Sequence, residues 1–240
     1  MSWAAHDIEP YLVRAKIGIA VSIPFCLLGS YSPDIVTKWA VYGLDFAGHA
    51  HLVDDPVELH RGWPGLGFTH TPAFGLLVAL LIWRLTRSRL WAGSFLLGHL
   101  MHLLSETPDS VGVMYLFPFS QARFGLGMWE YSSELGRQHD AVAYYTGLGG
   151  AWDIFWGVLL VLNWRILTTR YFVERIQDRD PFWPWLRQRT NQTFCLVAYR
   201  ASAFFGLASI VGWLVWSLFV QDFHASLDWS WGGPGWVPPP

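Results

Sequence analysis

Two histidines and two carboxylates stand near the end of one apolar segment, GHLMHLLSETPDSVGVMYLFPFS (98–120). At successive steps of 3, 4 and 3 residues, they keep to one face of a helix: His99, His102, Glu106 and Asp109. Ionisable residues in an apolar helix are costly, so they are usually paired or functional. The pattern predicts a chemical role at this helix end, with a simple hydrogen bond between His102 and Glu106 as the alternative.

Further histidines and carboxylates stand in HAHLVDDPVELHRGWPGLGFTH (49–70), and Asp34 follows the first apolar segment. A divalent metal is the physical reason to gather such groups, because imidazoles and carboxylates both ligate these ions. The competing interpretation is that the residues outside the apolar segments are solvated: Asp45, His49, His51, Asp54, Asp55 and Glu58. For His99, the alternatives are helix packing or ligation of a pigment or haem.

The composition is that of a membrane protein. Of 240 residues, 52% are apolar and only 14% are charged, whereas soluble domains carry about 25% charge. The 16 tryptophans suit the lipid–water boundary. A net charge of −2 argues against nucleic acid as a partner. Cys26 and Cys195 lie far apart, without the spacing of a disulfide framework or a thiolate zinc site.

Apolar segments of near-membrane length predict an all-α integral membrane protein, a bundle of about five transmembrane helices. The expected spans are 13–31, 69–85, 89–106, 148–167 and 199–220. They form one domain, 1–220, followed by an outer tail, 221–240, which is rich in Trp, Pro and Gly and too irregular for regular structure. The short apolar piece Val111 to Phe119 is expected to be re-entrant or interfacial.

Charge bias predicts the orientation of the helices. Twelve of the 16 basic residues fall on one side of a five-span arrangement. By the positive-inside rule, the N-terminus is then cytoplasmic and the C-terminus lies outside. His60, His70 and the polar end of 89–106 consequently meet at the outer face of the membrane.

Four motifs together resemble the LexA-binding, inner-membrane-associated hydrolase family, whose members are often described as membrane-bound metal-dependent hydrolases. They are HRG (60–62), FTH (68–70), H-x3-E-x2-D-x2-GV (102–113) and PFS (118–120). The resemblance covers about residues 15–120 and implies a multi-pass protein of the bacterial inner membrane. It also implies a bound Zn, Mn or Fe ion, with a metal-ligand set of Asp34, His60, His70, His102 and Glu106.

The resemblance also implies catalytic roles. A bound ion would activate water, and Glu106 or Asp109 would accept its proton. Arg61 would pair with an anionic group of the substrate. A site at the outer membrane face favours a lipid-like or lipid-linked substrate.

Departures from the family pattern favour a second hypothesis. Val36 stands where the family has Asp, and Asp109 stands where it has Thr. Glu106 replaces a shorter Asp, and residues 63–67 form an insert between the HRG and FTH motifs. The loss of the acidic residue at position 36 weakens the case for a two-metal site. On this hypothesis the chain is a non-catalytic subunit of a larger photosynthetic or respiratory membrane complex. Its contacts would be membrane lipid and other subunits, through Trp-rich surfaces and the tail.

Overall fold

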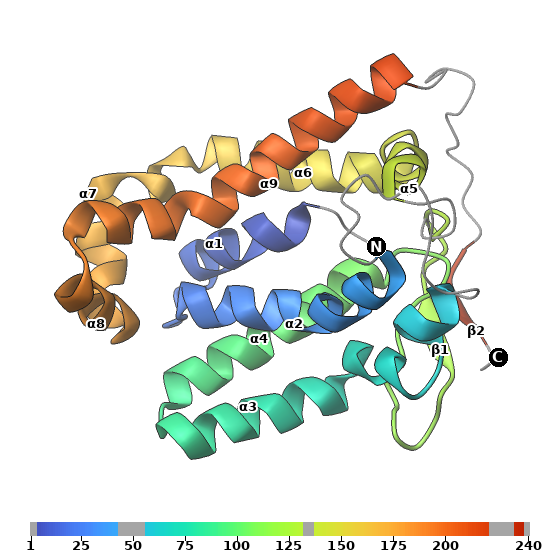
Figure 1. The fold of residues 1–240 in the computed structure, drawn as a ribbon, viewed down its shortest axis with the longest axis horizontal. Coiled ribbons are helices and arrows are strands. Elements are labelled where there is room, and N and C mark those ends of the chain that lie inside the picture. Colours follow the sequence, from blue (N-terminus) through green and yellow to red (C-terminus); the bar gives the residue numbers. More distant parts are fainter. Residues whose placement is uncertain (1–3, 43–55, 132–136, 221–232, 238–240) are drawn as a thin grey trace.

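The computed structural model describes residues 4–42, 56–131, 137–220 and 233–237. These residues are mostly helical, which confirms the expected all-α class. The long helices lie side by side (Figure 1): α1 (Ala5–Ile17), α2 (Ile23–Tyr42), α3 (Pro72–Thr86), α4 (Arg89–Glu106), α6 (Leu148–Leu162) and α9 (Gln192–Val220).

Short elements connect the long helices. Before α3 come a π-helical turn, Glu58–Gly62, and a 3-10 turn, Leu66–His70. Between α4 and α9 lie β1 (Arg123–Gly125), α5 (Arg137–Tyr145), the turn Trp164–Leu167, α7 (Thr169–Tyr171), the turns Phe172–Ile176 and Gln177–Arg179, and α8 (Phe182–Arg189). Strand β2 (Gly235–Val237) pairs antiparallel with β1.

Helix α1 is the centre of the bundle although it is rich in charged residues. It packs against α2 and α4 on one side and against α6 and α9 on the other (Figure 1). Its buried carboxylates have partners: Asp7 accepts from Tyr31 and Ser202, and Glu9 accepts from Ser105. The backbone N–H groups at its start donate to the Asp153 carboxylate at 2.9 and 3.1 Å. These contacts allow a polar helix to be buried.

The expected span 13–31 is not one helix. Helix α1 ends at Ile17 because Gly18 takes a left-handed conformation, with φ of 71°. The chain then turns, and α2 returns beside α1, so that the Ser30 hydroxyl reaches the His6 carbonyl at 3.3 Å. The start of α1 therefore lies at the same end of the bundle as the end of α9 (Figure 1). The expected five-span topology instead put these two helix ends on opposite sides.

The other expected spans correspond to single helices, with shifted ends. Segment 89–106 coincides with α4. The span expected at 69–85 begins as a helix only at Pro72, since Thr71 caps α3 by accepting from the Phe74 N–H. The span 148–167 ends as α6 at Leu162, and α9 begins before 199. Within the part of the chain that the structure describes, one helix is long and apolar enough to cross a membrane, Gln192–Phe219.

Two glycines let α2 and α4 approach closely. A Cβ atom added at Gly98 would overlap the backbone oxygen of Cys26, and one added at Gly29 would overlap that of Phe95. In contrast, a Cβ at Gly93 of α4 would have no neighbour within 4 Å. The close approach holds the polar end of α4 against α2.

We expect the Gly98→Ala substitution to lower the free energy of unfolding by about 1–3 kcal/mol, because the helices must separate. The matched substitution Gly93→Ala, in the same helix, should be neutral or stabilising by up to about 1 kcal/mol. Thermal or denaturant unfolding of the purified variants measures both. Equal stability of the two variants would contradict this packing.

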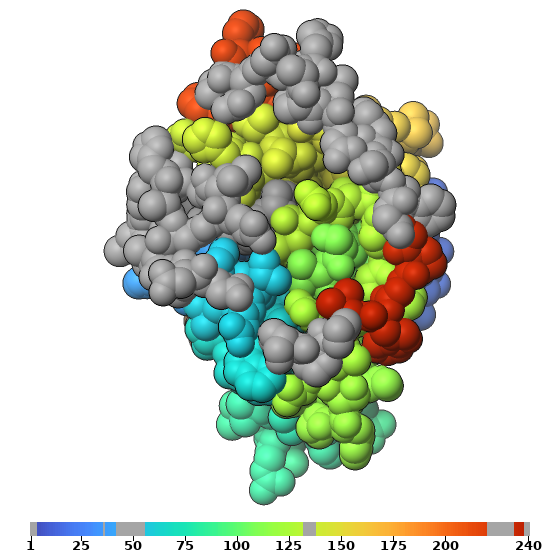
Figure 2. Space-filling view, turned by 90° about the vertical axis from the view of Figure 1, so that its right-hand side faces the viewer, coloured from blue at the N-terminus to red at the C-terminus, as the bar shows by residue number. Residues whose placement is uncertain are grey.

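The chain after α4 folds over one end of the bundle. Figure 2 shows residues 56–70, 107–131 and 233–237 exposed together on this face. Val113 forms a β-bridge with Phe124 and is buried, whereas Phe119 is 95% exposed. Trp236 of β2 packs on the Phe124 ring with centroids 5.3 Å apart. The described part of the tail thus forms a short strand, although no regular structure was expected there.

Candidate metal centre

Five separate segments bring their histidines and carboxylates to one place beneath this end of the bundle. They include every residue of the predicted metal-ligand set and one more, His6 of α1. Asp34 comes from α2, His60 from the π-helical turn, His70 from the end of the 3-10 turn, and His102 and Glu106 from α4.

Distances between ligand atoms are short. Asp34 Oδ1 lies 2.8 Å from His60 Nε2 and 3.3 Å from His70 Nε2. Glu106 Oε2 lies 3.3 Å from the Nε2 atoms of both His70 and His102. The His6 ring stacks on the His102 ring with centroids 4.0 Å apart.

Several of these buried atoms have no hydrogen-bond partner. They are both ring nitrogens of His6 and of His102, Nε2 of His70, and both carboxylate oxygens of Glu106. Buried polar atoms are nearly always satisfied, so a group of orphaned nitrogens and oxygens facing one another needs an explanation. A divalent cation would satisfy one nitrogen of each histidine and the carboxylate, because it accepts lone pairs from imidazole and carboxylate together. The residues present therefore fit a metal ion.

The cluster divides into two overlapping groups that could each hold a metal ion. One comprises His6, Asp34, His102 and Glu106, and the other Asp34, His60 and His70. Within each group, one ligand atom of every residue lies within 4.8 Å of the others. Asp34 belongs to both groups, and its side chain retains 17% exposure while the other predicted ligands are buried.

His60 has a partner on its other ring nitrogen. Its Nδ1 is hydrogen-bonded to the Tyr131 hydroxyl, which lies 71 residues away in the chain. Burial lowers the pKa of His60 to about 4 despite the neighbouring Asp34, so the ring is neutral at pH 7. If Nδ1 carries the proton and donates it to Tyr131, the Nε2 lone pair faces Asp34 and is available to a metal.

Arg61 lies behind the cluster and is fully buried. Its guanidinium is paired with the Asp109 carboxylate, lies 3.5 Å from Glu106 Oε2, and sits 4.3 Å from the Tyr131 ring centre. Burial lowers the pKa of Arg61, but the carboxylates of Asp109 and Glu106 outweigh it and raise that pKa above its usual range. Arg61 is thus engaged within the protein, where its charge orients Glu106.

Asp109 lies beside Arg61 and is absent from both ligand groups of the described residues. Helix α4 ends at Glu106, and Pro108 follows, so the chain turns before Asp109. Its Oδ1 accepts the N–H groups of Val111 and Gly112 at 3.1 and 2.9 Å. Burial raises the pKa of Asp109, but Arg61 opposes this and the net shift is downward.

His99 is placed as a helix-packing residue. Its Nε2 lies 2.9 Å from the Thr71 carbonyl oxygen, and its Nδ1 lies 3.3 Å from the Ser32 hydroxyl. A Cβ added at Gly75 would overlap the His99 ring. The contacts of His99 match the packing alternative for this residue. A pigment or haem would need one ring nitrogen as its ligand, but both nitrogens face protein oxygens.

Some expected residues lie outside the described part of the chain: Asp45, His49, His51, Asp54 and Asp55. Glu58 begins the π-helical turn that carries His60 and Arg61. Thr69 fixes the neighbouring His70, since its hydroxyl lies 3.0 Å from the Pro33 carbonyl oxygen and 3.2 Å from His70 Nδ1.

Three residues near the cluster were not expected from the sequence. His6 was expected in a cytoplasmic N-terminal segment. The sequence feature that could have shown a separate helix is the polar stretch HDIE, followed by Gly18. Lys38 lies one helical turn after Asp34, with its Nζ 3.5 Å from Asp34 Oδ2. Nothing in the sequence marks Tyr131 as a neighbour of the cluster.

No known protein family, curated protein or solved structure was found to match this chain.

Proposed function

We propose that the protein is a metal-dependent hydrolase embedded in the bacterial inner membrane, acting at its outer face on a lipid-like or lipid-linked substrate. One observation carries this proposal: four histidines and two carboxylates meet in a buried cluster with orphaned lone pairs. The resemblance of the motifs HRG, FTH and PFS to a family of membrane hydrolases supports it.

A multi-pass arrangement is supported by the surface of the bundle. Large apolar side chains are strongly exposed on α3, α6 and α9: Leu77, Leu85, Val161, Leu162, Phe205 and Phe219. Lipid would cover them. Six helices would then cross or enter the membrane, with the start of α1 and the end of α9 outside. Helix α1, about 20 Å long, needs no match to the bilayer because other helices surround it.

The residues divide the chemical work as follows. His6, Asp34, His60, His70, His102 and Glu106 would hold the metal, which when bound lowers the pKa of a coordinated water towards about 7. Glu106 would accept the proton of the attacking water at Oε1, which has no hydrogen-bond partner. Lys38 would hold an anionic group of the substrate beside the exposed edge of Asp34. Arg61 and Asp109 would position Glu106.

The purified full-length protein is expected to contain at least one Zn, Mn or Fe ion per chain, measured by elemental analysis. His70→Ala and His102→Ala should each lose the metal of the ligand group to which the histidine belongs, because both remove an orphaned nitrogen of the cluster. His139→Ala, at an exposed position of α5, is the control and should retain it. Metal-free wild-type protein, or equal retention in all three variants, would refute the proposal.

The second candidate function is a non-catalytic subunit of a larger membrane complex. It is favoured by exposed aromatic side chains that could contact other subunits: Trp39, Trp63, Trp83, Trp164, Trp185 and Trp236. A native pull-down with elemental analysis of the same sample separates the two. Metal-free protein in stoichiometric association with other membrane subunits would support this candidate.

A further inference from the structure

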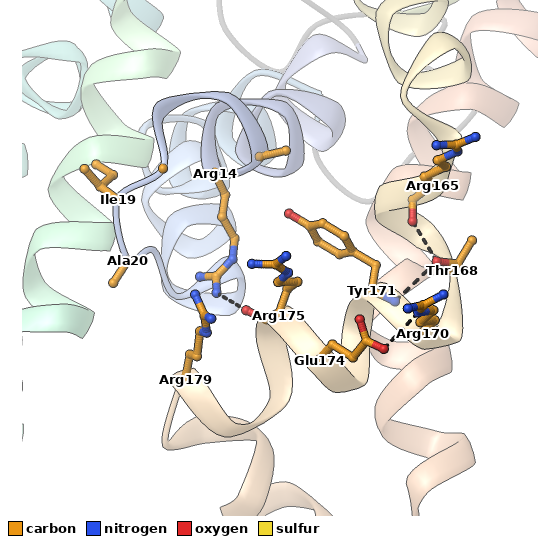
Figure 3. A pocket seen from close by; sticks show the side chains of 12 residues that line it. Arg14, Ile19, Ala20, Arg165, Thr168, Arg170, Tyr171, Glu174, Arg175 and Arg179 are labelled. Carbon is orange, nitrogen blue, oxygen red and sulfur yellow. Dashed lines mark hydrogen bonds and ion pairs between the residues drawn. The ribbon is translucent and has the colours of Figure 1, made fainter.

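A cavity of about 840 Å³ lies where α1 meets the segment between α6 and α8, and it is lined by five arginines and one glutamate. The arginines are Arg14, Arg165, Arg170, Arg175 and Arg179. The cavity lies at the end of α1 opposite to His6, so it is separate from the metal cluster. Figure 3 shows the guanidinium groups of Arg14, Arg175 and Arg179 turned towards one another.

The positive charge of this cavity is largely uncompensated. Arg170 pairs with Glu174 at 2.8 Å, and Arg14 donates to the Arg175 carbonyl oxygen at 2.9 Å. Within the described residues, no carboxylate lies within ion-pair distance of Arg14, Arg165, Arg175 or Arg179. Like charges gathered around one space repel each other, and an anion placed there would relieve that repulsion. Several arginines around one cavity are suited to the oxygens of a phosphate group.

An apolar groove continues from the cavity. The groove has a volume of about 360 Å³ and shares Ile19 and Ala20 with the arginine cavity. It runs along α4, where its lining includes Leu90, Gly93 and Leu97. A ligand that fills both spaces therefore needs a negatively charged end and a hydrocarbon end.

We propose that this site binds an anionic phospholipid of the cytoplasmic leaflet, with the phosphate in the arginine cavity and an acyl chain in the groove along α4. The basic end of the bundle is the cytoplasmic end under the positive-inside rule, and anionic lipids are enriched in that leaflet. The inference rests on the membrane embedding of the proposed function but is independent of the metal.

The test uses the full-length protein, delipidated in a nonionic detergent, and measures the dissociation constant for phosphatidylglycerol. Arg175→Gln combined with Arg179→Gln should weaken binding on the order of 30-fold, since each basic residue contributes about fivefold. Arg84→Gln combined with Arg87→Gln removes the same charge at the same end of the bundle but outside the cavity, and should change the constant less than about twofold. Equal losses of phosphatidylglycerol affinity in the two double variants would refute the proposed binding site.

The groove and the identity of the ligand have their own controls. Gly93→Leu should fill the groove and weaken phosphatidylglycerol binding, whereas Gly212→Leu, on the open face of α9, should not. Glycerol 3-phosphate and phosphatidylcholine are expected to bind far more weakly than phosphatidylglycerol. Equal binding of glycerol 3-phosphate would identify a soluble phosphate ligand, and equal binding of phosphatidylcholine would refute charge recognition. Elemental analysis of the same variants should show unchanged metal, so the lipid and metal proposals can fail separately.

Discussion

Replacing Arg61 by methionine is expected to lower the free energy of unfolding by about 3–5 kcal/mol. Methionine is shorter than arginine but keeps an unbranched, flexible apolar stem, so the variant removes the charge without adding another polar group. Asp109 and Glu106 would then both remain as buried carboxylates without their shared cation. Leaving a buried charge unpaired is much more costly than losing an exposed ion pair. Denaturant unfolding of the detergent-solubilised protein measures the difference.

Arg170→Met is the matched control for this prediction. Arg170 makes an ion pair of 2.8 Å with Glu174, but its side chain is 85% exposed. Its loss should therefore change stability by no more than about 1 kcal/mol. If Arg61→Met proved as stable as Arg170→Met, Arg61 could not be the cation that holds the two buried carboxylates. The role of Arg61 as a positioning residue would then be wrong as well.

One part of the candidate metal site could be predicted because local spacing determines it, whereas Asp34, His60 and His70 were expected from the family resemblance. His102 and Glu106 are one helical turn apart on α4, and the helix bounds inferred from the sequence agree with the structure. Asp109 shows the limit of the same reasoning. A continuous helix would keep it on the face of Glu106, but the helix ends at Glu106, before Pro108, and the Asp109 carboxylate turns to Arg61. Helical periodicity describes only residues inside the helix.

The position of His6 could not be read from hydrophobicity. A helix surrounded by other helices has no lipid-facing side, so α1 can bury charged residues that a sequence window assigns to water. The partners that make this possible, Asp153 and Ser202, are far away in the chain. The length of the apolar segments consequently merged the end of α1 with α2 into one span. The orientation built on those spans put the start of α1 and the end of α9 on opposite sides, whereas they lie at the same end of the bundle. Tyr131 could not be predicted either, because its partner His60 also lies far away in the chain.

The two overlapping ligand groups lead to a prediction about the number of ions. The acidic residue missing at position 36 argued against a two-metal site, but His6 supplies a ligand that the sequence did not place there. If both groups are occupied, the wild-type protein binds two ions per chain.

The substitution His6→Ala should then remove one ion, His60→Ala should remove the other, and Asp34→Ala should weaken both, because Asp34 belongs to both groups. We expect the affinity of each affected position to fall by at least about 100-fold, at the upper end of what the loss of a supporting residue costs. Elemental analysis gives the stoichiometry, and competition with a chelator gives the affinities. In the double variant with His6 and His60 both replaced by alanine, no tightly bound ion should remain.

A single ion per wild-type chain, weakened alike by His6→Ala and His60→Ala, would instead mean that all six residues surround one metal. The shared carboxylate of Asp34 would then be an ordinary ligand, since a bridging role requires that two ions be lost independently.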